Sequence, residues 1–285
     1  MSTTARLAGF GVMLAVLFGG GALAGGAIGI DRGEPRTAQA EAGTAEHGGG
    51  HGDKGAAVRP VRGLAVAQDG LRLVLEDVEL RRGRTEEVRF RIVSDDGATV
   101  RDFDVEHTKR MHLIVARRDL TGFQHLHPQQ RPDGTWSVSL RLGEAGSFRL
   151  FADFSNRGKA FTLAADLRVD GAAELRALPA PAASAKSDGG YDVRLNSGRA
   201  RPGQEADLRF TISKGGETVR TEPYLGAGGH LVTLREGDLA FLHVHPKDAG
   251  VGFAATFPTA GSYRLFLQFK RDGRVQTVAF TQEVK

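Results

Sequence analysis

Apolar side chains recur at every second position in many short segments of this chain. Three such segments contain Leu71, Leu73 and Leu75; Val88, Phe90 and Ile92; and Trp136, Val138, Leu140 and Leu142. A period of two matches a β-strand, whose successive side chains point to opposite faces of a sheet. Gly, Asp and Pro interrupt these segments roughly every 8–12 residues, as turns do in a β-sandwich. The pattern predicts an all-β fold of antiparallel strands.

Two stretches of the sequence occur twice. AGSFRLFADF at 145–154 returns as AGSYRLFLQF at 260–269, and RGRTEEVRFRI at 82–92 returns as RPGQEADLRFTI at 201–212 with one inserted residue. Self-similarity over this distance indicates a duplicated domain. We therefore expect two tandem immunoglobulin-like antiparallel β-sandwiches.

The boundaries of the two copies follow from the composition around them. The first copy, repeat 1, is predicted at 64–170, and the second copy, repeat 2, at 191–285. Residues 171–190 are rich in Ala and Pro, which is typical of a linker.

The N-terminal residues predict export. No charged residue occurs between Arg6 and Asp31, so residues 1–30 carry an apolar run long enough for a helix to span a hydrocarbon core of about 30 Å. This run is interpreted as a signal anchor or a signal peptide, and 31–63 as a flexible tether. Retention implies a single-pass membrane protein with its C-terminal domains outside the cytoplasm. Cleavage near Ala40 would instead release a secreted protein.

Composition excludes several other classes of protein. The formal net charge is only +4, and Arg residues are scattered through alternating segments, which argues against a nucleic-acid partner. The chain has no Cys, so disulfides, thiolate metal sites and Cys nucleophiles are excluded. No GxSxG, GxxxxGK[ST] or HExxH motif occurs, and the expectation is that the protein is not an enzyme.

Two groups of three histidines have the same spacing. In each repeat one histidine is followed by twelve residues and then by a His-x-His-Pro motif, and the two groups are offset by 118 residues. The members are His112, His125 and His127 in repeat 1 and His230, His243 and His245 in repeat 2. Other matched positions in the two repeats have drifted to different offsets, so the histidines kept a spacing that their surroundings did not.

A hairpin would bring each group together. If Glu236-Gly237 forms a two-residue turn, His230 faces His243, and His245 projects from the same face two residues along. The same construction pairs His112 with His125. Directly opposed Cβ atoms lie about 4.5–5.5 Å apart, close enough for the imidazoles to share one ion.

Three neutral imidazoles without a thiolate suit Cu(II) or Zn(II) and leave one coordination position open. His107, beside Glu106, is a further candidate ligand in repeat 1, whereas Met111 is expected to point to the opposite face. In the alternative reading the histidines carry no metal, and each fixes a loop by donating a hydrogen bond to a carbonyl.

The segments MHLIVARRDLTGFQHLHP (111–128) and EPYLGAGGHLVTLREGDLAFLHVHP (222–246) resemble those of a group of bacterial exported proteins with duplicated HLHP-type domains. Some members of the group are labelled heavy-metal-associated, and their domains are similar to YtkA-like immunoglobulin-type β domains. The resemblance covers both repeats and implies a pair of β-sandwiches outside the cytoplasm, with a metal role for the six histidines.

Taken together, these patterns predict an extracytoplasmic protein that binds or delivers a transition metal, with copper as the first choice and zinc as the second. Its expected partners are the metal ion, the membrane through the N-terminal helix, and a protein outside the cytoplasm. The alternative is a metal-free, membrane-tethered structural or interaction module.

Overall fold

The computed structural model describes residues 61–242, 244–247 and 250–285. The predicted anchor, the cleavage position near Ala40 and almost all of the predicted tether lie outside these ranges, and so does His243. Within them, no helix combines the length and the apolar character that a membrane crossing requires. The described part of the chain is all-β, which confirms the predicted fold class.

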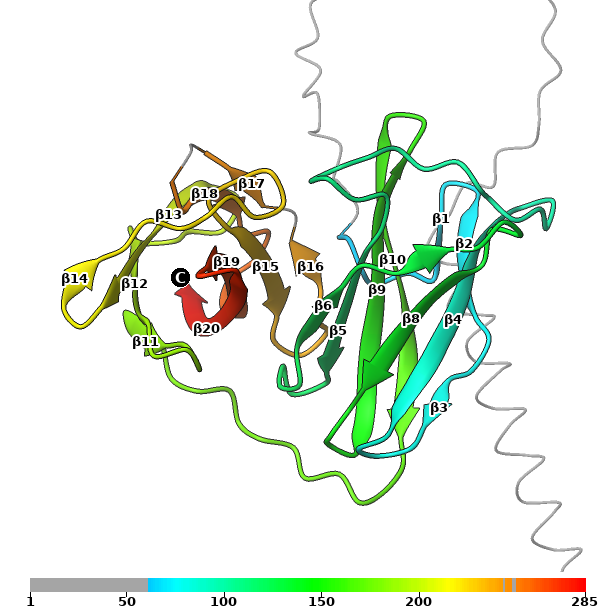
Figure 1. Cartoon of the computed structure of the whole chain (residues 1–285), viewed down its shortest axis with the longest axis horizontal. Helices are drawn as coiled ribbons and strands as arrows, with labels where there is room; N and C mark the ends of the chain where they lie inside the picture. The colour runs from blue at the N-terminus through cyan, green and yellow to red at the C-terminus, as the bar shows by residue number, and fades with distance from the viewer. Residues whose placement is uncertain (1–60, 243, 248–249) are drawn as a thin grey trace, which may run out of the picture. The chain divides into compact units, whose positions relative to one another are not determined.

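Repeat 1 contains two sheets (Figure 1). The first sheet has the order β1 (Ala67–Gln68), β2 (Leu71–Leu75), β4 (Thr85–Ser94), β8 (Trp136–Arg141), β7 (Gln129–Gln130). The second has the order β3 (Glu79–Leu80), β10 (Lys159–Val169), β9 (Gly146–Asn156), β5 (His112–Arg117), β6 (Gln124–Leu126). All neighbours are antiparallel except β3 and β10, which pair in parallel.

Repeat 2 has the same plan. Its first sheet has the order β11 (Ser184–Lys186), β12 (Asp192–Ser197), β13 (Glu205–Lys214), β18 (Gly252–Thr256), β17 (His245–Pro246), with β14 (Glu217–Thr218) also paired to β13. Its second sheet has the order β16 (Phe241–Leu242), β15 (His230–Arg235), β19 (Gly261–Arg271), β20 (Arg274–Val284). The chain thus folds as two tandem immunoglobulin-like sandwiches, as the repeats predict.

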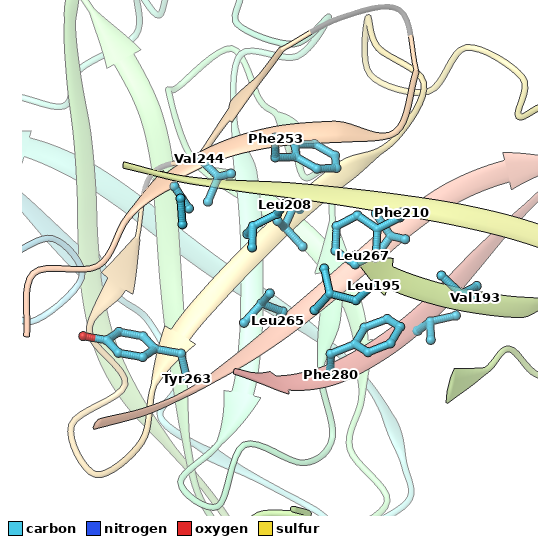
Figure 2. Packing of buried hydrophobic residues seen from close by; sticks show 14 of the residues in the cluster. Val193, Leu195, Leu208, Phe210, Val244, Phe253, Tyr263, Leu265, Leu267 and Phe280 are labelled. Carbon is cyan, nitrogen blue, oxygen red and sulfur yellow. The ribbon is translucent and has the colours of Figure 1, made fainter. Parts of the chain in front are cut away.

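Each sandwich has its own apolar core, and the alternation along the strands explains it. In β4, Val88, Phe90 and Ile92 are fully buried, while the residues between them are more exposed. Figure 2 shows the core of repeat 2, where side chains of β13 and β18 meet those of β19 and β20; the labelled residues include Leu208, Phe210, Phe253, Leu265, Leu267 and Phe280. Burying one such side chain contributes about 1.5–3 kcal/mol to folding.

Strand β5 is buried on both faces. Leu113 and Val115 belong to the core of repeat 1, whereas Ile114 and Ala116 belong to a third apolar cluster that also contains residues of repeat 2. We call this cluster the inter-repeat interface; its buried members are Ile114, Ala116, Leu120, Phe151, Ala164, Val232, Leu234, Leu239, Phe241 and Phe266. The second sheets of the two repeats therefore pack against each other through their outer faces.

Two aromatic pairs join the two repeats at this interface. The ring of Phe123 stacks on that of Phe266 with a centroid distance of 4.0 Å, and the rings of Phe151 and Phe241 lie 5.6 Å apart. Phe123 and Phe241 occupy matching positions in the two repeats, and so do Phe151 and Phe266. The interface thus has approximate two-fold symmetry.

The linker after repeat 1 also packs against the sandwich. The buried guanidinium of Arg117 donates a 2.6 Å hydrogen bond from Nη2 to the carbonyl of Glu174, and the backbone N–H of Arg176 donates to Asp119. Leu178 then packs against the inter-repeat interface.

The hairpin register differs from the predicted one by two residues. Thr233 pairs with Leu242, because the loop after Arg235 has four residues and closes with a hydrogen bond from the N–H of Arg235 to the carbonyl of Ala240. In repeat 1, Ile114 pairs with His125, which places His112 across from position 127. A shift of two residues leaves every side chain on its predicted face, because the side-chain period is two.

The prediction that His245 shares a face with His230 is wrong. His245 lies in β17 and pairs with Ala254 of β18, in the first sheet of repeat 2, whereas His230 begins β15 in the second sheet. The chain crosses from one sheet to the other directly after β16, which separates these two histidines.

Candidate metal centre

Three histidines of repeat 1 converge beside the inter-repeat interface. His112 begins β5, His125 lies in β6, and His127 follows β6. One ring nitrogen from each lies within 4.8 Å of the other two, and the side chain of His112 is buried. This spacing allows three imidazoles to bind a single ion, because zinc and copper bond to imidazole nitrogen at about 2 Å.

Hydrogen bonds to oxygen atoms set the orientation of two of these rings. His112 donates from Nε2 to the backbone carbonyl of Glu106 at 3.1 Å, and His125 donates from Nδ1 to Oε1 of Gln268 at 2.7 Å. Both oxygens can only accept, so the N–H of each imidazole is on that side. The lone pairs are consequently on His112 Nδ1 and His125 Nε2.

These two nitrogens face each other at 3.0 Å. A hydrogen bond between them would require an additional proton, because the N–H of each ring is already donated elsewhere. Two ligand atoms of one metal ion normally lie at about this separation. The arrangement is that of metal-ligating histidines, whose second nitrogen is held by a carbonyl or amide oxygen.

The third ring supplies a nitrogen that lacks a partner. His127 Nε2 is buried and makes no hydrogen bond within the described part of the chain. A buried imidazole nitrogen without a partner costs about 1–3 kcal/mol. Coordination of an ion would remove that cost.

Burial keeps the imidazoles neutral. It lowers the pKa of His112 to about 4 and that of His125 to about 3, and burial together with nearby Lys109 lowers the pKa of His127 to about 4. Neutral imidazole is the form that binds metal. Near neutral pH, protons therefore compete little with an ion at this site.

A histidine of repeat 2, His230, lies beside the same site. The ring centroid of His230 lies 4.8 Å from that of His125 and 5.7 Å from those of His112 and His107. Burial, followed by the neighbouring imidazoles, lowers the pKa of His230 well below its usual value. His245 is exposed in β17, and His243 lies outside the described residues. The structure thus brings together four of the six predicted residues, with His107 beside them.

A strained turn holds the carbonyl that orients His112. Glu106 and Lys109 exchange backbone hydrogen bonds of 2.8 and 2.9 Å across His107 and Thr108, which both have positive φ, 46° and 67°. A β-branched residue in this conformation costs about 1–3 kcal/mol, and such strain clusters at functional sites. At the matching turn of repeat 2 the second position is Gly226.

Gln268 was not among the residues predicted from the sequence, although a signal for it was present. The repeated stretches ADF and LQF place Asp153 and Gln268 at matching positions, each a polar residue in an apolar strand. Asp153 pairs with His112 across β5 and β9 and accepts a hydrogen bond from Thr162, and Gln268 pairs with His230 and donates to Thr277. Burial raises the pKa of Asp153 to about 6.

A family model described as a domain of unknown function, DUF8832, matches residues 65–171 and 185–285. The chain belongs to the DUF8832 family. No curated protein sequence matches this DUF8832 chain.

Several solved structures are similar to the DUF8832 chain at low identity. FdeC, an Escherichia coli adhesin, is 14% identical with a TM-score of 0.28; the match covers 78% of this chain and 66% of the adhesin chain. A Lin-41 filamin domain is 12% identical with a TM-score of 0.26, covering 37% of this chain and 97% of that chain. Titin domains Z1Z2, solved with telethonin, are 15% identical with a TM-score of 0.21; the match covers 76% of this chain and 96% of the titin chain.

The lowered pKa values predict that the metal-free protein loses stability in mild acid. The unfolded chain takes up protons on its histidines near pH 6.5, while folded His112, His125 and His127 take them up only near pH 3–4. The three histidines therefore contribute to the free energy of unfolding above pH 6.5. This contribution is lost as the pH falls towards 4, at roughly 1.4 kcal/mol per pH unit for each proton that the unfolded chain takes up. Asp153 has the opposite effect, because its pKa is raised to about 6 and the folded protein takes up this one proton before the unfolded chain does.

Urea unfolding of the metal-free protein between pH 7.5 and 4.5 measures this dependence. His127→Gln should make it less steep, and His245→Gln, at an exposed position of β17, should leave it unchanged. A stability that stays constant or rises towards pH 4.5 would contradict the prediction.

Proposed function

We propose that this protein binds a transition metal, copper in the first place, at His112, His125 and His127. The observation that carries the proposal is the 3.0 Å approach of His112 Nδ1 and His125 Nε2, two lone pairs that oxygen acceptors turn towards each other. The unpartnered nitrogen of His127 supplies the third ligand.

The ligand set favours binding or transfer of the metal over catalysis. It contains imidazoles and no thiolate, and the cysteine-containing site of an electron-transfer copper protein is therefore excluded. Imidazole suits both copper and zinc, and copper binds more tightly at equal ligation. A binding or delivery protein needs no substrate pocket beyond the ion.

The proposed location is outside the cytoplasmic membrane. The uncharged run between Arg6 and Asp31 supports export, and the absence of Cys is compatible with it. In that compartment the protein would receive the ion from, or pass it to, a second exported protein.

Calorimetric titration of the full-length chain with Cu(II) and with Zn(II) tests the proposal. We expect uptake of one ion by the wild-type protein, with Cu(II) bound more tightly than Zn(II). His127→Gln should weaken binding of both, and His245→Gln is the matched control with unchanged binding. If the wild-type protein binds neither ion, the proposal is refuted, and the metal-free structural module remains.

A further inference from the structure

Residues of repeat 2 form part of the histidine cluster of repeat 1. Gln268 of β19 accepts the hydrogen bond that fixes the ring of His125, at 2.7 Å. This contact joins residues 143 positions apart in the sequence, so the tautomer of His125 depends on repeat 2. Outer partners of this kind typically change metal affinity by roughly 10–100-fold when they are removed.

His230 adds an imidazole from the same repeat. Its ring is stacked beside His125 at 4.8 Å and lies nearly parallel to His112 at 5.7 Å, with 7° between the planes. The hydrogen bonds that orient the cluster join His112, His125, Glu106 and Gln268 and do not include His230. The ring nitrogens that already converge within 4.8 Å are those of His112, His125 and His127, and His230 is the imidazole of repeat 2 that lies beside them.

The inter-repeat interface holds these residues in place. His230 and Gln268 pair across β15 and β19, two residues from the paired Val232 and Phe266, which are both buried in the interface. The stack of Phe266 on Phe123 links β19 directly to the segment that leads into β6 and His125. A displacement of one repeat against the other would therefore move the ligands apart.

We propose that the two repeats hold one ion jointly, with His230 as the fourth imidazole ligand and Gln268 as the positioning residue of His125. This inference rests on the proposed function, since it requires an ion at His112, His125 and His127. Four imidazoles complete a tetrahedral or tetragonal set. His230 is favoured over His107 of repeat 1 as the fourth, because its ring centroid lies 4.8 Å from that of His125, whereas the ring of His107 is 6.1 Å from that of His112. The bound ion then ties repeat 1 to repeat 2.

The test uses Cu(II) and the full-length chain in three forms: wild type, His230→Gln and Gln268→Leu. Titration should give one ion per wild-type chain, and electron paramagnetic resonance should count four coordinated nitrogens. His230→Gln should reduce the count to three and weaken binding more than about a hundredfold, as expected for one of four ligands. Gln268→Leu should keep four nitrogens and weaken binding roughly 10–100-fold.

His245→Gln is the matched control, because it makes the same change in the same repeat at an exposed position of β17. It should leave affinity and nitrogen count unchanged. Hydrogen exchange of the wild-type protein gives a readout that needs no variant: Cu(II) should slow exchange in β5 and β6 and also in β15 and β19.

Three results would overturn the proposal. If His230→Gln binds Cu(II) with wild-type affinity and an unchanged nitrogen count, the ion belongs to repeat 1 alone, although the proposed function stands. Protection confined to repeat 1 in the hydrogen-exchange experiment has the same meaning. A wild-type chain that binds no Cu(II) refutes both the proposed function and this inference.

Discussion

Replacing His125 with Leu is expected to abolish tight metal binding while the protein still folds. His125 is the central ring of the site, since its Nε2 faces His112 and its Nδ1 is held by Gln268. Structural metal sites with four ligands bind with about 10–16 kcal/mol, so one ligand contributes roughly 3 kcal/mol or more. The dissociation constant should therefore rise at least about a hundredfold.

The fold should survive this change because Leu has about the same size as His125, and the loss of the hydrogen bond to Gln268 costs about 1–3 kcal/mol. His125 pairs with Ile114, and Gln268 keeps its hydrogen bond with Thr277. Thermal unfolding of the metal-free variant at pH 7 checks the fold, and calorimetry with Cu(II) measures the affinity. A folded variant that retains wild-type affinity would remove His125 from the site and leave the proposed ligand set without its centre.

Replacing Phe266 with Ala is expected to produce the second large effect, a loss of about 3–5 kcal/mol in the free energy of unfolding. Phe266 is 4% exposed and stacks on Phe123 across the inter-repeat interface. Because its strand also carries Gln268, we expect weaker Cu(II) binding by the folded variant as well. Urea unfolding and calorimetry measure the two quantities.

The variant Phe257→Ala distinguishes a loss of interface packing from a loss of core packing. Phe257 is fully buried in the core of repeat 2 and does not belong to the interface. Its replacement should destabilise the protein by a similar amount and leave the metal affinity of the folded protein unchanged. Equal losses of affinity in the two variants would mean that the interface has no special connection with the site.

The fold class could be predicted from the sequence because strand periodicity is a local property. Val88, Phe90 and Ile92 alternate in the sequence and are buried together in the structure. The duplication could also be predicted, since the similar stretches AGSFRLF and AGSYRLF lead into the matching strands β9 and β19. The grouping of His112, His125 and His127 followed from a hairpin and survived an error of two residues in its register.

The packing of the two repeats against each other could not be predicted, because it depends on the outer faces of two sheets. Ile114 and Val232 look like ordinary core residues in the sequence, and nothing local says that they pack against each other. His230 was assigned to a separate site in repeat 2, whereas its ring lies beside His125. Gln268 was missed for the same reason, since its partner is in the other repeat.

The linker packs against repeat 1 and keeps the two sandwiches in one molecule, which matters for binding an ion between them. Were the two sandwiches separate molecules, their encounter would depend on concentration and would cost translational freedom. A short tether raises the effective concentration of one sandwich around the other into the millimolar range. Because the linker with Glu174, Arg176 and Leu178 joins the two halves in a single polypeptide, the residues of the candidate site stay together even in a highly dilute solution.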